Sequence, residues 1–149
     1  MWKFLYEALV QALANLKWSS FLATNRDNSE MARRMRTVFQ TEIYTYSGYI
    51  CIGITLLATL IYYFFLNRKG GSGYWFRNQY WAYALLLNVL IIFSLTLWVS
   101  SSLTSSYSLL HPFKYTLAIA ITNALYAVVF FVLFSIIFKR GSVANTTPF

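Results

Sequence analysis

Three long stretches without a charged side chain limit what this sequence can fold into. They cover residues 46–66, 81–103 and 115–138 and are 21, 23 and 24 residues long. A helix that crosses the hydrocarbon core of a bilayer needs about 20 mostly apolar residues, at about 1.5 Å of rise per residue. None of the three stretches contains a proline. The sequence therefore predicts an all-α integral membrane protein with three transmembrane helices.

The segments around the three spans are short, and none of them is long enough to form a soluble domain. Residues 1–23 are predicted to form an amphipathic helix, and residues 24–45 a basic extramembrane helix that leads into the first span. The connector at residues 67–80 is basic and rich in glycine. The second connector, residues 104–114, is rich in serine, and residues 139–149 form a short polar tail.

The amphipathic pattern at the N-terminus separates polar from apolar residues at helical spacing. Lys3, Glu7 and Gln11 recur on one side, whereas Leu5 and Leu9 begin an apolar row on the other. Such a helix can lie in the membrane interface. The alternative is that the same helix packs against a partner protein. A fourth span is disfavoured because three charges fall within the first 22 residues.

The charge of the chain is strongly basic and unevenly placed. Twelve Lys and Arg face four Asp and Glu, which gives a net charge of +8, and no acidic side chain follows Glu42. The cations flank apolar spans, so anionic lipid headgroups are the expected partner and nucleic acid is not. The candidate headgroup contacts are Arg33, Arg34, Arg36, Arg68, Lys69, Lys139 and Arg140.

The distribution of cations leaves the orientation in the membrane undecided, because five lie close to the spans on either side. We expect the N-terminus on the cytoplasmic or matrix side. Moving about 45 residues with six cations across a bilayer is the harder alternative when no signal peptide precedes them. The expected location is a mitochondrial or bacterial inner membrane.

The residue types that carry catalysis are scarce. The chain has one histidine, His111, and one cysteine, and the spans contain no Asp, Glu, Lys, Arg or His. Metal sites and acid–base pairs need clusters of such groups, and ion-coupled transport depends on ionisable groups within the membrane. The sequence therefore predicts no catalytic residue, no metal site and no cofactor. We interpret His111, beside Pro112, as an interfacial turn residue.

Small and weakly polar residues form a face on two of the spans. In the first span they are spaced by three, four and four residues, and in the third span by three and four. Small side chains let transmembrane helices approach closely, so both faces are expected to contact protein rather than lipid. The residues are Gly48, Cys51, Thr55 and Thr59 in the first span and Ala120, Asn123 and Ala127 in the third.

Two asparagines stand inside the apolar spans, and their depths predict partners. In antiparallel helices, Asn88 lies at the level of Thr59, and Asn123 lies nearest in depth to Thr55 or Ser94. We therefore expect two separate interhelical polar contacts. A direct bond between the two asparagines is disfavoured, because their depths differ by roughly 9 to 12 Å at helical rise.

Two functions fit these features. The first is a non-catalytic accessory or structural subunit of a larger membrane complex, for example an energy-transducing or respiratory one. The alternative is a holin-like pore made of copies of the chain, with Thr55, Thr59 and Asn88 lining the lumen. The sequence favours a subunit with other membrane proteins as partners, because no charged ring is available to line a channel.

Overall fold

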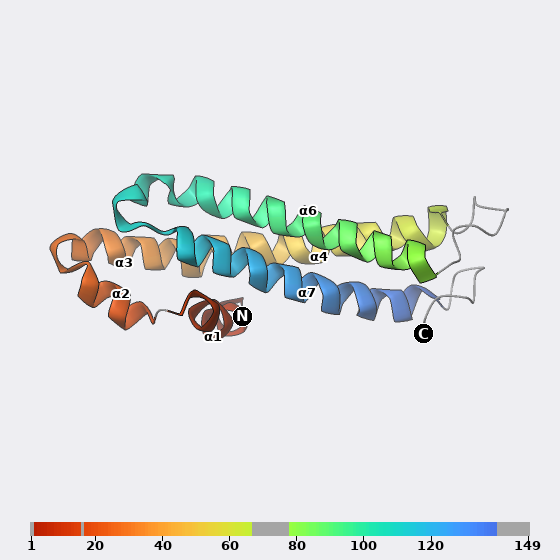
Figure 1. Cartoon of the computed structure of the whole chain (residues 1–149), viewed down its shortest axis with the longest axis horizontal. Helices are drawn as coiled ribbons and strands as arrows, with labels where there is room; N and C mark the ends of the chain where they lie inside the picture. The colour runs from red at the N-terminus through yellow and green to blue at the C-terminus, as the bar shows by residue number, and fades with distance from the viewer. Residues whose placement is uncertain (1, 16, 67–77, 140–149) are drawn as a thin grey trace. The chain divides into compact units, whose positions relative to one another are not determined.

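The computed structural model describes residues 2–15, 17–66 and 78–139, and no strand occurs among them (Figure 1). Within these residues, three helices are long and apolar enough to cross a membrane: Arg26–Leu66, Gln79–Tyr107 and Phe113–Lys139. The all-α fold with three potential spans is confirmed. It is compatible with a small membrane protein.

The first of these helices is continuous but changes its winding twice. It consists of α3 (Ser29–Val38), a π-helical turn (Phe39–Ile43), α4 (Tyr44–Leu60) and a second π-helical turn (Ile61–Leu66). The other two long helices are α6 (Asn78–Thr104) and α7 (Phe113–Lys139), and a tighter 3₁₀ turn (Ser105–Leu110) lies between them. The sequence offers no glycine or proline between α3 and α4 that would interrupt the helix.

The N-terminal segment is two helices, whereas the sequence predicted one helix over residues 1–23. The helix α1 (Trp2–Ala14) ends beside Asn15, whose φ angle of 49° is left-handed, and α2 (Trp18–Thr24) follows. Asparagine adopts this conformation more readily than most residues, and it commonly ends a helix in this way. A short 3₁₀ turn (Arg26–Asn28) then leads into α3.

The chain packs as two compact units, and the three long helices contribute to both. The first unit contains residues 1–50 and 93–123, and the second contains residues 51–92 and 124–149. Each unit therefore takes one part of α4, of α6 and of α7. Only the first unit also holds α1, α2 and α3.

Aromatic rings form the core of the first unit. Trp18 stacks on Tyr115, with 4.2 Å between ring centroids and 3° between ring planes. Phe21 and Phe39 both approach this pair edge-on. These contacts fix α2 against the end of α3 and the start of α7. In Figure 1 α1 is seen end-on while the start of α7 runs across the page, so α1 lies crosswise within this unit.

The second unit has an interior of aromatic and small residues. Tyr62, Tyr63, Trp81 and Phe131 form one buried cluster, and the indole N–H of Trp81 donates to the Ser135 hydroxyl at 3.2 Å. A second cluster contains Cys51, Ile92 and Ala127. Most large outward side chains of the unit are aliphatic and suit lipid tails, and Phe64, Phe65 and Tyr83 add exposed aromatic rings. The aliphatic ones include Leu86, Leu87, Leu90, Leu125, Val129 and Leu133.

Candidate functional site

Asn123 is fully buried in α7, and its side chain forms hydrogen bonds to three other helices of the first unit. Its amide nitrogen donates to the Ser47 backbone carbonyl at 3.0 Å and to the Thr96 hydroxyl at 2.8 Å. Its amide oxygen accepts the hydroxyl proton of Tyr6. One amide group thereby joins α1, α4, α6 and α7. Both polar ends of the amide are satisfied, which removes the cost of burying it in an apolar environment.

The partners of Asn123 differ from those expected from depth. The sequence placed Asn123 near Thr55 or Ser94, but Ser94 is exposed and Thr96, two residues further along α6, is buried. Counting residues fixes the level along a helix, but it leaves open which face points inward. The Tyr6 contact was missed for another reason: α1 was expected to lie on lipid or on a partner protein.

Asn88 in the second unit has fewer hydrogen-bond partners than Asn123. Its amide nitrogen donates to the Thr55 hydroxyl at 3.3 Å, and its buried amide oxygen has no partner among the described residues. The expected pairing with Thr59 is wrong by one helical turn. The Thr59 hydroxyl is instead satisfied within its own helix, because it donates to the Thr55 carbonyl at 2.8 Å.

The small faces of the first and third spans are turned inward. Gly48, Cys51, Thr55 and Thr59 are all buried, and so are Ala120 and Ala127. The chain itself therefore covers these faces.

This burial bears directly on the pore hypothesis. Thr55 and Thr59 are 0% exposed and Asn88 is 1% exposed. A lumen between copies of the chain would need these side chains on the outer surface of the helices. The expected lining is therefore contradicted while the second unit keeps this packing.

The cations expected at lipid headgroups have different surroundings. Arg33 and Arg34 are exposed on α3. The Arg36 guanidinium donates to the Glu7 carboxylate at 3.4 Å, so an acidic group of α1 already neutralises it. Lys139 is partly buried at the end of α7. The other three cations, Arg68, Lys69 and Arg140, lie outside the described residues.

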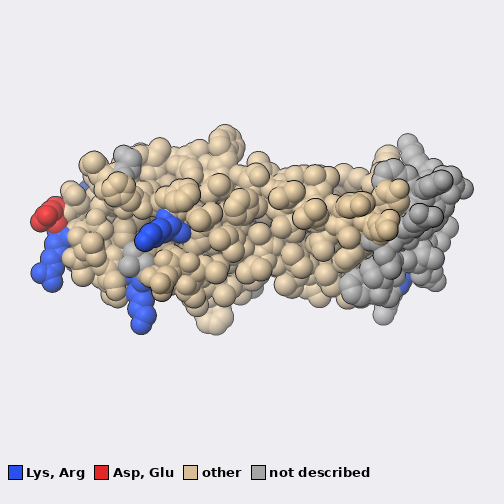
Figure 2. All heavy atoms as spheres, in the orientation of Figure 1, with Lys and Arg blue, Asp and Glu red and all other residues tan. Residues whose placement is uncertain are grey.

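The Glu7 carboxylate also holds α1 in place. The Gln40 amide nitrogen donates to the same oxygen at 3.0 Å, and the Lys3 ammonium lies 4.0 Å from the other oxygen. Figure 2 shows Lys and Arg side chains on the visible face over α2, α3 and the start of α7. The first unit therefore carries a basic surface around the N-terminal helices. Such a surface is of the kind expected to face anionic lipid headgroups.

One surface of α6 was not singled out from the sequence. Ser94, Trp98 and Ser102 are all exposed, at the four-residue spacing of a helix face, and Trp98 is 68% exposed. A groove of about 480 Å³ adjoins this serine–tryptophan face. The groove is lined by Tyr46, Ile50, Trp98, Val99, Ser102 and Leu103. The regular serine spacing around Trp98 was a signal that could have identified it.

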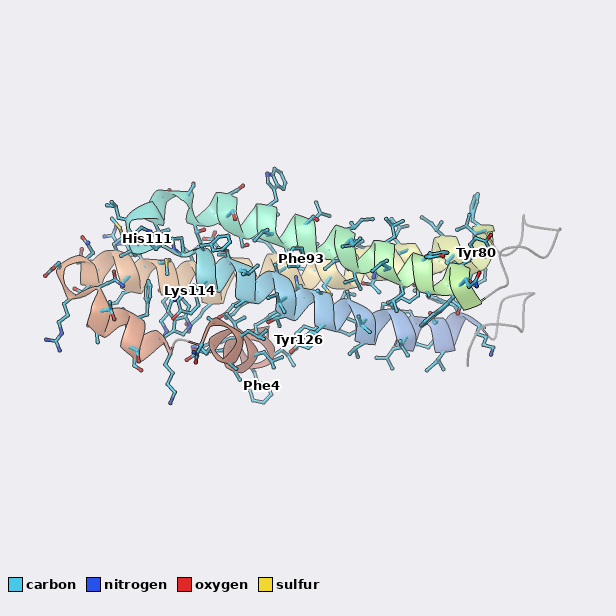
Figure 3. All side chains as sticks on the ribbon, viewed as in Figure 1. Phe4, Tyr80, Phe93, His111, Lys114 and Tyr126 are labelled. Carbon is cyan, nitrogen blue, oxygen red and sulfur yellow. The ribbon has the colours of Figure 1, made fainter. Side chains whose placement is uncertain are left out.

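His111 lies in the turn before α7, as interpreted from the sequence, with an exposed side chain and a left-handed φ angle of 48° (Figure 3). Across residues 2–15, 17–66 and 78–139, no three His, Cys, Asp or Glu side chains gather closely enough to hold a metal ion. The arrangement offers positioned amides and hydroxyls, which fasten helices together.

Comparison with protein-family models finds no matching family, and comparison with curated proteins and with solved structures finds no match.

Proposed function

We propose that the chain is a non-catalytic accessory subunit of a larger membrane complex, and that its serine–tryptophan face contacts a transmembrane helix of a partner subunit. The observation that carries the proposal is a change of surface along α6. In the second unit α6 exposes Tyr83 near its start and then only aliphatic residues from Leu86 to Ile91, whereas in the first unit it exposes three serine hydroxyls and the Trp98 indole.

Lipid tails carry no hydrogen-bonding groups, so they cannot favour one of these two surfaces over the other through hydrogen bonds. A transmembrane helix of a partner can. Serine is small enough to let two backbones approach, and its hydroxyl can bond across the contact. Each such bond contributes on the order of 0.6 to 2 kcal/mol. Trp98 stands beside the groove, where an exposed aromatic ring can anchor a partner.

The chemistry of the spans supports a structural role over transport or catalysis. The three predicted spans contain no Asp, Glu, Lys, Arg or His. The buried amides and hydroxyls described above are used in packing within each unit. The pore alternative loses its main support, because its proposed lining residues are buried.

Photo-crosslinking tests this proposal. A photoreactive amino acid would replace Trp98 in one variant and Leu87 in a control, since these side chains have similar exposures of 68% and 60%. In the native membrane, we expect the probe at position 98 to form an adduct with one other membrane protein. The probe at position 87 should label lipid. Lipid adducts alone at position 98, or adducts with copies of this chain, would refute the proposed heteromeric contact.

A further inference from the structure

The helix α1 presents three different flanks. Tyr6, Val10 and Ala14 are buried against the first unit. The Glu7 flank points toward α3, because Glu7 contacts Arg36 and Gln40. At 100° per residue, the row Leu5, Leu9 and Leu13 falls on the side opposite Glu7, and all three leucines are exposed.

These flanks orient α1 relative to a membrane. Exposed Arg33 and Arg34 mark the α3 side as the polar one. The leucine flank points the other way, as expected for a helix that lies in the interface with its apolar side toward the hydrocarbon. The crosswise direction of α1 in Figure 1 fits this placement. Phe4, 89% exposed, points away from the rest of the unit in Figure 3.

A pocket of about 710 Å³ opens where α1 meets α2. On the helical wheel of α1, its lining residues fall between the Glu7 flank and the leucine flank. With the leucine flank toward hydrocarbon, the pocket would open where headgroups meet acyl chains. It is lined by Ala8, Gln11, Ala12, Asn15, Lys17 and Ser20.

The lining of this pocket suits an anion. It contains an ammonium group from Lys17, amides from Gln11 and Asn15, a hydroxyl from Ser20, and no carboxylate. The Gln11 amide oxygen accepts the backbone N–H of Trp18 at 3.4 Å, so this side chain offers its N–H groups to a ligand. The two alanines keep the pocket open.

We propose that the pocket between α1 and α2 binds the phosphate group of an anionic phospholipid. Lys17 supplies the counter-charge, and the amides of Gln11 and Asn15 and the Ser20 hydroxyl donate to phosphate oxygens. The acyl chains run along Leu5, Leu9 and Leu13. A bound lipid of this kind holds the crosswise helix at the membrane surface.

Lipid titration of the full-length protein in detergent, followed by native mass spectrometry, tests this site. Phosphatidylglycerol should bind more tightly than phosphatidylcholine. Lys17→Gln should weaken phosphatidylglycerol binding about fivefold, the change expected for one lysine near an anionic surface. Lys114→Gln is the matched control, because Lys114 is an exposed lysine outside this pocket (Figure 3).

A second variant separates the pocket from diffuse surface charge. Ala12→Phe fills the pocket without changing the charge, so it should weaken phosphatidylglycerol binding while the protein remains folded. Equal effects of Lys17→Gln and Lys114→Gln, or no effect of Ala12→Phe, would overturn the proposal. Displacement of the lipid by millimolar inorganic phosphate would also contradict it, since the ligand would then be free phosphate.

Discussion

Replacement of Asn123 by leucine is expected to lower the free energy of unfolding by about 2 to 4 kcal/mol. The amide of Asn123 bonds Tyr6, Ser47 and Thr96 at once. Leucine has a similar volume but no hydrogen-bonding group, so the Tyr6 and Thr96 hydroxyls lose their shared partner in a buried environment. Each buried polar group left unpaired costs about 1 to 3 kcal/mol. Thermal or denaturant unfolding in detergent, followed by circular dichroism, measures the effect.

Asn88→Leu is the matched control for this substitution. The Asn88 amide nitrogen donates to the Thr55 hydroxyl at 3.3 Å, and its buried oxygen has no partner among the described residues. Leucine removes a weak bond and an unpaired polar atom together, so the two changes offset each other and the expected effect is about 1 kcal/mol or less. Equal losses for Asn88→Leu and Asn123→Leu would contradict this ranking of the two amides.

Trp18→Ala is expected to destabilise the first unit by about 3 to 5 kcal/mol, the usual cost of truncating a buried tryptophan. Trp18 is 2% exposed and stacks on Tyr115, with Phe21 and Phe39 against it. Its loss should free α2 from the start of α7. Unfolding in detergent should show the lower stability, and trypsin should cut faster at Lys17 and Arg26, which flank α2.

Trp98→Ala provides the comparison for Trp18→Ala, because Trp98 is 68% exposed. Its truncation in the isolated protein should change the stability by no more than about 0.5 kcal/mol. Similar losses in the two tryptophan variants would show that the aromatic cluster around Trp18 does not hold α2.

The three long helices were predictable because a single property, uninterrupted apolar length, determines whether a helix can cross a bilayer. Rotation about each helix axis was not predictable in the same way. Counting residues along the helices placed Asn88 at the level of Thr59, but in the structure Asn88 bonds to Thr55, one turn away. The same counting selected Thr55 or Ser94 for Asn123, although Thr55 pairs with Asn88 and Thr96 is the residue that binds Asn123.

The contribution of α1 was missed for a different physical reason. Its leucine row suggested an apolar side for lipid or a partner, and those leucines are indeed exposed. Tyr6 was not expected to pack inside the chain, because the sequence pattern predicts that it belongs to an interfacial helix. Its hydroxyl reaches a residue 117 positions away in the chain, a contact that local periodicity cannot indicate.

The burial of the small, weakly polar face of the first span disfavours the pore and favours the subunit. Gly48, Thr55 and Thr59 looked like a surface that needed a partner, yet the chain covers them itself. The surface that we propose for a partner is the serine–tryptophan face of α6 in the first unit. The proposed partner contact therefore lies on the second span and not on the first.

The mass and composition of the native particle, extracted in mild detergent and analysed by size and mass spectrometry, test the subunit proposal most directly. We expect one complex containing this chain and different membrane proteins, such as redox or ATP-synthase components. Ser94→Phe with Ser102→Phe should release the chain from the complex, whereas Leu86→Phe with Leu90→Phe on the aliphatic surface should not. A ring made only of copies of this chain that conducts ions in a bilayer would contradict the proposal.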